Sequence, residues 1–252
     1  MKLLANELLK IKRSRSVKVL FAVFLAFIFL STCVGKNTGS ARMRSGFAGP
    51  FMWNGIMGAA GLFAYGAIAA GMVADEFQLG VVQNALSCGI SRRRYFTAKV
   101  ISALGASAVL YLVCAGIFTA FLTGVYGFDP EGLVFSDYWL TVLAFNGAAL
   151  AVQLSCMSMY ICFAYVFRKA SVTFAASVLA TVIEAFASAR LIKADTMGGG
   201  VYGPFATTFL LSQHFVADTI LTREFALLTL PCMGIMVISL LASYFLFLKR
   251  GV

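Results

Sequence analysis

Polar side chains are rare in the long apolar segments of this 252-residue chain, and four of them could line a path for a solute. They are Asn54, Asn146, Gln153 and Glu184. Asn146 and Gln153 are seven residues apart, as are Gln153 and Tyr160, so the three share one helical face. This polar stripe suits either a translocation path or hydrogen bonding between helices. Glu184 could contact a cationic substrate or relay a proton, or it could lie at the wet edge of an outer vestibule.

A second group of candidate residues lies in segment 75–96, DEFQLGVVQNALSCGISRRRYF, which carries five charges in 22 residues. Apolar residues at helical spacing in its middle predict a short amphipathic helix parallel to the membrane, with Gly89 as its stop. Asp75 and Glu76 stand near the amino end of that helix, where the helix dipole favours anions. The arginines follow its other end. This order of acid, helix, glycine and basic cluster predicts a surface shaped for a protein partner.

Several kinds of chemistry have no support in the sequence. No stretch matches GxxxxGK[ST], so any ATP-driven work would need ATP and Mg bound to a partner subunit. No HExxH, GxSxG or paired intramembrane carboxylate is present, which leaves no catalytic residue to assign. The six cysteines show no paired spacing, and the one histidine, His214, lacks ligand neighbours. We expect no metal site and no disulfide framework.

The composition places these residues in membrane-spanning helices. The chain is 61% hydrophobic and 12% charged, which excludes a water-soluble domain with a charged surface. We predict an all-α polytopic membrane protein whose residues 1–252 form one domain. Six apolar segments are long enough to cross a bilayer as helices. These predicted spans are 17–34, 51–74, 98–125, 138–167, 170–189 and 226–248, with a loop at 75–97.

The distribution of basic residues predicts the orientation of the spans. Alternate flanks place 14 Lys and Arg residues on one side and six on the other. By the positive-inside rule both termini are cytoplasmic. Trp53 and Trp139 fall at predicted outer boundaries, where an indole is favoured. The net charge of +10 is then explained by orientation and by contact with anionic lipid of the bilayer, without nucleic-acid binding.

Two further segments are predicted to lie along the membrane surface. The first 16 residues place Leu4, Leu8 and Ile11 at helical spacing, which favours an amphipathic surface helix, although a disordered basic tail is the alternative. In the outer connection 190–225, VYGPFATTFLLSQHFV favours a re-entrant or interfacial helix, or an outer lid. Segment 17–34 contains LSTC, which resembles a lipoprotein cleavage site; Thr32 fits that site poorly, and we expect a permanent span.

The loop after the second predicted span resembles the type-2 ATP-binding-cassette (ABC) transporter permeases. The layout of surface helix, six spans and re-entrant segment is also similar to that family. Val81 departs from the family pattern, which often has Thr after the glycine. The motif residues are an acid, a glycine, a leucine-serine pair, a serine-arginine pair and a lysine: Glu76, Gly80, Leu86, Ser87, Ser91, Arg92 and Lys99.

The resemblance implies a bacterial cytoplasmic-membrane protein in which the loop is a coupling helix that docks on a separate ATPase subunit. Two permeases, identical or paralogous, would pair, and ATPase closure would drive alternating access. Arg168 and Lys169 would form a second contact. The small size is most similar to permeases for bacteriocin or bacitracin immunity, with amphipathic peptide, antibiotic or toxin substrates. Coupling residues implied in this way are Asp75, Glu76, Gly80, Leu86, Ser87, Ser91, Arg92, Arg93, Lys99, Arg168 and Lys169.

Two other classes of protein remain as alternatives. A non-transporting accessory or sensor protein explains the spans but gives no reason for the ordered loop. An intramembrane enzyme would require converging titratable groups, and the spans offer essentially Glu184 alone.

Overall fold

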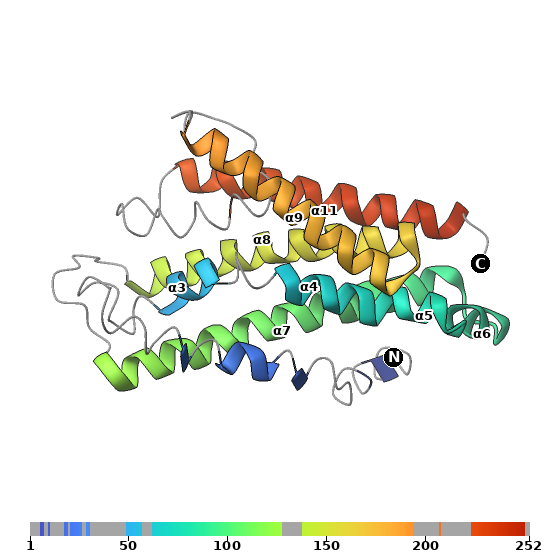
Figure 1. Cartoon of the computed structure of the whole chain (residues 1–252), viewed down its shortest axis with the longest axis horizontal. Coiled ribbons are helices and arrows are strands. Elements are labelled where there is room, and N and C mark those ends of the chain that lie inside the picture. Colours follow the sequence, from blue (N-terminus) through green and yellow to red (C-terminus); the bar gives the residue numbers. More distant parts are fainter. Residues whose placement is uncertain are drawn as a thin grey trace.

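The computed structural model describes residues 6–7, 10, 18–19, 21–26, 29–30, 49–56, 62–127, 138–193, 207 and 223–249. Within these residues all regular structure is helical. The four longest helices, α7, α8, α9 and α11, run along an elongated bundle (Figure 1). The elements are α3 (Gly49–Ile56), α4 (Leu62–Ala69), the π-helix η4 (Ala70–Ala74), α5 (Asp75–Gln78), α6 (Val81–Ser87), α7 (Arg92–Tyr126), α8 (Tyr138–Phe167), α9 (Ala170–Lys193) and α11 (Arg223–Lys249).

Three described helices are long and apolar enough to cross a membrane: Arg92–Tyr126, Phe145–Phe167 and Thr229–Lys249. They correspond to the third, fourth and sixth predicted spans. The fifth predicted span coincides with α9, whose apolar part, Ala170–Glu184, is shorter. The described parts of the first two predicted spans, 18–19, 21–26 and 29–30 in the first and 51–56 and 62–74 in the second, are helical. As complete spans they stay predictions. The predicted amino-terminal helix and the segment 190–225 lie largely outside the described residues.

Helix α7 is longer than a bilayer requires. Its 35 residues extend about 52 Å at 1.5 Å per residue, whereas the hydrocarbon core is about 30 Å thick. It begins at Arg92, six residues before the predicted start of the span, because the Oγ of Ser91 accepts a hydrogen bond from the backbone N–H of Arg94. The first turns of α7 are therefore available to the end of the bundle.

The helix of the second predicted span does not end at its first charged residue. Ala69 and Ala74, where α4 passes into η4 and η4 into α5, both keep right-handed helical dihedrals, so the helix is continuous. It ends at Leu79, and Gly80 follows with a positive φ of 68°. Asp75 and Glu76 accordingly occupy the carboxyl end of a helix, and our prediction that they begin one is wrong. The helix dipole opposes their charge there.

We predicted a single helix in the middle of the loop, but Gly80 divides this stretch. Residues before Gly80 belong to α5, and those after it form α6. Helix α6 ends in a Schellman motif: the N–H of Ile90 donates to the carbonyl of Ala85 at 3.3 Å, and that of Gly89 to Leu86 at 3.0 Å. Gly89 has a φ of 85°, which residues with a side chain rarely adopt. The loop thus has two fixed reversals, one on each side of α6.

Close packing joins the helices of the bundle. Helix α8 packs along α11, α3 packs against α7, and α4 against α9. A Cβ on Gly66 of α4 would lie 3.1 Å from the Cβ of Ser177, and one on Gly49 would lie 2.6 Å from Thr119 Oγ1. These glycines let neighbouring backbones approach.

We predicted that the indole of Trp53 lies at an outer boundary where it can contact headgroups, but this side chain does not face lipid. Its side chain is fully buried, packs against Phe24 at 5.6 Å between ring centroids, and donates from Nε1 to the carbonyl of Tyr111 at 3.2 Å. Packing between α3 and α7 outweighs the preference of an indole for headgroups. The side chain of Trp139 lies outside the described residues.

Candidate functional site

The candidate site lies where several helix ends meet at one end of the bundle (Figure 1). Helices α5 and α6 and the start of α7 form this end, together with the turn from α8 to α9 and the last residues of α11. The family resemblance assigns a coupling role to all of these segments except the end of α11. We call this region the coupling end.

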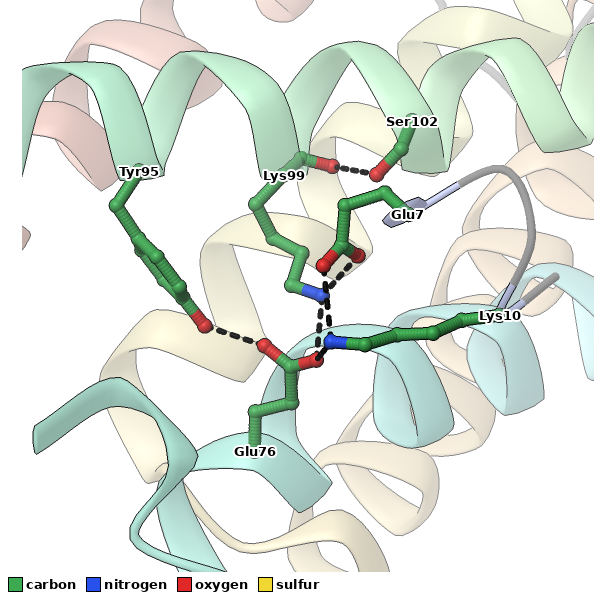
Figure 2. Close-up of polar contacts among 6 residues, drawn as sticks. All are labelled: Glu7, Lys10, Glu76, Tyr95, Lys99 and Ser102. Carbon is green, nitrogen blue, oxygen red and sulfur yellow. Dashed lines mark hydrogen bonds and ion pairs between the residues drawn. The ribbon is translucent and has the colours of Figure 1, made fainter. Parts of the chain in front are cut away.

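Four charged side chains form a closed ring at the coupling end (Figure 2). Lys99 of α7 pairs with Glu76 of α5 at 2.7 Å and with Glu7 of the amino-terminal segment. Lys10 pairs with Glu76 and with Glu7, both at 3.0 Å. Each carboxylate therefore contacts both ammonium groups, and the charges alternate around the ring. We call these residues the four-charge ring.

Burial makes this pairing necessary. The side chain of Lys99 is 3% exposed, and those of Glu7 and Glu76 are also buried. A buried charge without partners is strongly unfavourable, whereas here the two positive and two negative charges cancel. Tyr95 adds a hydrogen bond from its hydroxyl to Oε2 of Glu76, the oxygen that faces away from the lysines.

The ring also controls the ionisation of its members. Burial alone would raise the pKa of Glu76, but the charge of Lys99 and hydrogen bonds from Lys99, Tyr95 and Lys10 outweigh burial and lower this pKa. Burial alone would lower the pKa of Lys10, and its hydrogen bonds to Glu7 and Glu76 raise this pKa instead. Asp75 lies outside the ring, and burial raises its pKa. The ring thus favours the charged forms of Glu76 and Lys10 near neutral pH.

Most motif residues make contacts within the chain that fix the shape of the loop. Gly80 supplies the positive φ that ends α5, Ser91 caps α7, and the hydroxyl of Ser87 donates to the carbonyl of Asn84 at 3.0 Å. Leu86 is half-buried against the core. These contacts give the loop a defined form without a partner.

The three arginines that begin α7 have different surroundings. Arg92 is half-buried and donates from Nη1 to the carbonyl of Leu248 at 3.2 Å. That carbonyl belongs to the last turn of α11, where cations are favoured. Arg93 and Arg94 are exposed. Only the latter two are free to reach across the surface towards another molecule.

The turn at Arg168 and Lys169 contacts the same loop. Arg168 has a φ of 55°, and its guanidinium carbon lies 5.2 Å from the ring centre of Phe77 in α5. The N–H of Ala170 donates to Oε1 of Gln78 at 3.4 Å. The structure thus places side by side the two segments to which the family resemblance assigns a coupling role.

Aromatic packing connects α5 with the bundle. Phe77 packs against Tyr165 of α8 at 5.6 Å and against Phe247 of α11 at 6.3 Å between ring centroids. Phe247 in turn stacks with Tyr95 and Phe96 of α7. A displacement of α5 would therefore press on α8 and α11 through Phe77, and on α7 through Phe247.

The outer surface of the loop is a separate set of side chains. Leu79, at the turn between α5 and α6, is 74% exposed. Gln83 and Asn84 of α6 are also exposed, as are Arg93 and Arg94. These five side chains form what we call the loop surface.

Two of the four polar residues proposed for a path, Asn54 and Gln153, pair with each other and join two helices. Gln153 of α8 donates from Nε2 to Oδ1 of Asn54 in α3 at 3.4 Å, and both are buried. The hydroxyl oxygen of Tyr160, on the same face of α8, lies 2.6 Å from the hydroxyl oxygen of Thr181 in α9. These are interhelical hydrogen bonds of the kind that we weighed against a path. Asn146 and Glu184 are half-buried, and a path along this stripe stays a prediction.

Sequence reasoning missed Glu7. It is the sole acidic residue in the first 74, among six basic residues in the first 18, and that isolation was a usable signal. We interpreted the amino-terminal segment only by its apolar spacing and its basic charge. This segment comprises residues 1–16, of which the structure describes 6–7 and 10, and these are helical.

The fold and site define an integral membrane protein of packed helices with no cluster of potential metal ligands in the part described. The family model described as "ABC-2 family transporter protein" matches residues 3–188, about three quarters of the chain. The chain therefore belongs to the ABC-2 transporter family. Membrane subunits of this family are generally non-enzymatic and typically work with an ATPase subunit. The comparison with curated proteins gives no match.

Proposed function

We propose that this chain is the permease subunit of an ABC exporter and that its loop at 75–97 receives force from a separate ATPase subunit, which binds the ATP and Mg. Membership of the ABC-2 family supports the class of protein. The observation that carries the coupling role is the convergence of α5, α6 and the Arg168–Lys169 turn at one end of the bundle. A loop that only oriented the spans would require its basic residues but not this packing.

The loop surface and the buried motif residues would have different tasks. Leu79 offers an apolar anchor, and Arg93 and Arg94 offer charge to a partner with acidic groups on its surface. Buried Glu76 and Lys99 would then keep the loop in place. Phe77 would pass the displacement to α7, α8 and α11 through the aromatic contacts described above.

The remaining parts of the proposal concern orientation, assembly and substrate. The distribution of basic residues supports a cytoplasmic position for both termini and for the coupling end. Two permeases, identical or paralogous, would enclose the path in a bacterial cytoplasmic membrane. The apolar helices favour an amphipathic peptide, antibiotic or toxin over a hydrophilic substrate.

Co-purification tests this proposal directly. Tagged permease extracted from its native membrane should retain a protein that carries GxxxxGK[ST] and hydrolyses ATP. Leu79→Ala should reduce the amount retained several-fold, because it removes the apolar anchor. Leu230→Ala is the matched control, since Leu230 is 65% exposed but lies in the half of α11 away from the coupling end. Absence of any ATPase from the wild-type preparation would overturn the permease function.

A further inference from the structure

The amino-terminal segment contributes two members of the four-charge ring, Glu7 and Lys10 (Figure 2). They are three residues apart and pair with each other, so this segment brings a pair with no net charge. Glu76 and Lys99 also pair with each other, although they lie on different helices. The ring therefore consists of two neutral pairs that lie antiparallel: Glu7 contacts Lys99, and Lys10 contacts Glu76. Unlike charges thus meet at every contact.

Neutralisation alone does not explain this arrangement. Lys99 already has a counterion in Glu76, so Glu7 is not needed to balance its charge. The burial of Glu7 is unfavourable unless both of its oxygens find cations, and they do: Lys10 contacts Oε1 and Lys99 contacts Oε2. The contacts from Glu7 to Lys99 and from Lys10 to Glu76 join the amino-terminal segment to α7 and to α5 at the same time.

We propose that the four-charge ring fastens the amino-terminal segment to the coupling end, with Glu7 and Lys10 as positioning residues that hold α5 against α7. A movement of α5 must then carry the amino-terminal segment with it or open the ring. The side chain of Lys10 is 55% exposed, whereas that of Lys99 is 3% exposed, so the ring opens most easily at Lys10. The positioning role rests on the proposed coupling function, but the fastening does not.

A charge reversal tests the fastening without changing composition. The double variant Glu7→Lys with Lys10→Glu keeps the pair within the segment and the net charge. It places a second ammonium group beside Lys99 and a second carboxylate beside Glu76. Like charges at both contacts should release the segment. Trypsin added to the cytoplasmic face of vesicles that contain the permease alone should cleave after Arg13 and Arg15 at least about tenfold faster, a change of about 1.4 kcal/mol or more.

Two further variants keep this test decisive. Asn6→Ala is the matched control, because Asn6 is exposed beside Glu7, and its cleavage rate should equal that of the wild type. Adding the second reversal, Glu76→Lys with Lys99→Glu, restores alternating charges and should slow cleavage towards the wild-type rate. Equal cleavage of the wild type and the first double variant would overturn the proposal, as would absence of rescue in a quadruple variant that still elutes as a folded protein.

The positioning role has its own measurement. In the complex with its ATPase, the first double variant should retain the same amount of ATPase but change its rate of ATP hydrolysis several-fold, because α5 is no longer held. An unchanged rate would remove Glu7 and Lys10 from positioning. Failure of any ATPase to bind the wild type would instead overturn the proposed function, and the cleavage result would stand separately.

Discussion

The coupling end and the middle of the bundle both contain buried polar groups, but of different kinds. At the coupling end two carboxylates and two ammonium groups form the four-charge ring, with Tyr95 as a further donor. In the middle the buried pairs are neutral: Asn54 with Gln153, and Tyr160 with Thr181. Ionised groups are most costly far from water, and Lys99 lies about 10 Å from the start of α7, near the bundle end.

This difference predicts unequal consequences for loss of a partner. A buried ion whose counterion is removed cannot be solvated, and the cost is about 3–5 kcal/mol. Interhelical hydrogen bonds between neutral groups within membranes contribute about 0.6 kcal/mol on average. Removal of charge should therefore disrupt the coupling end far more than removal of an amide disrupts the middle.

Lys99→Met should have the largest effect. It leaves Glu7 and Glu76 buried with only half-exposed Lys10 between them, and we expect a loss of about 3–5 kcal/mol. Thermal unfolding in detergent, followed by size-exclusion chromatography, measures the change. Lys18→Met should leave stability near the wild-type value, because Lys18 is exposed. Equal stability of the two variants would show that the ring does not stabilise the fold.

The pH dependence of Glu76→Gln sharpens the comparison further. The pKa of Glu76 lies below its ordinary value of 4.5, so its ionised form stabilises the fold above that pH. This contribution is lost as pH falls through the lowered pKa. The gap between wild type and Glu76→Gln should be about 2 kcal/mol at pH 7 and shrink below pH 4.5. Thermal unfolding from about pH 7 to about pH 3.5 measures it.

Several other titratable groups lie near Glu76 at the coupling end. Asp75 titrates in the opposite sense, since burial raises its pKa, but it is present in both proteins and cancels. Glu7, Lys10, Lys99 and Tyr95 are the titratable groups that contact or lie beside Glu76. Lys10, with its raised pKa, contributes below its ordinary 10.5 and loses that contribution only above it. A gap that grows on acidification would contradict the assignment.

Gln153→Leu should cost less, about 1 kcal/mol, because a neutral contact of 3.4 Å to Asn54 is lost. A double-mutant cycle with Asn54→Leu isolates the contact, since each single variant also changes packing. We expect a coupling energy of about 0.6 kcal/mol in thermal unfolding. A coupling energy of about 3–5 kcal/mol, as large as the loss expected from Lys99→Met, would remove the distinction between the two regions.

Tyr160→Phe should have the smallest effect, at most about 0.6 kcal/mol. Thr181 keeps a partner after the change, because its hydroxyl also donates to the carbonyl of Ser177 at 3.0 Å. The same unfolding measurement on Tyr160→Phe and Lys99→Met should therefore give the two ends of the series. A loss from Tyr160→Phe comparable to that from Lys99→Met would contradict this order.

Local patterns in the sequence predicted the features that neighbouring residues decide. Runs of apolar residues identified the three helices that are long enough to span a membrane, since hydrophobic length is a property of each segment. Gly89 was identified as the end of a helix because its lack of a side chain permits the positive φ of a Schellman motif. The loop residues and their order likewise placed the chain in its family.

Features that join distant segments could not be predicted in the same way. Glu7 and Lys99 are separated by 92 residues, and no local pattern indicates which buried lysine takes a given carboxylate. Whether Glu76 lies at the start or the end of a helix depends on whether the preceding helix continues. The spacing of apolar residues does not show that the π-helix η4 joins α4 to α5. Arg92 and Leu248 meet only because the first turn of α7 lies beside the last turn of α11.

The sequence by itself determined a helical membrane protein of the ABC-2 family, with acidic and basic residues placed in order along one loop. Hydrophobicity, turn chemistry and motif order act over a few residues or one helix, so they can be followed along the chain. Only the tertiary structure decided that the acid of this loop ends a helix and pairs in a ring with the amino-terminal segment. Buried ions select partners by distance in space, and that distance exists only once the helices have packed.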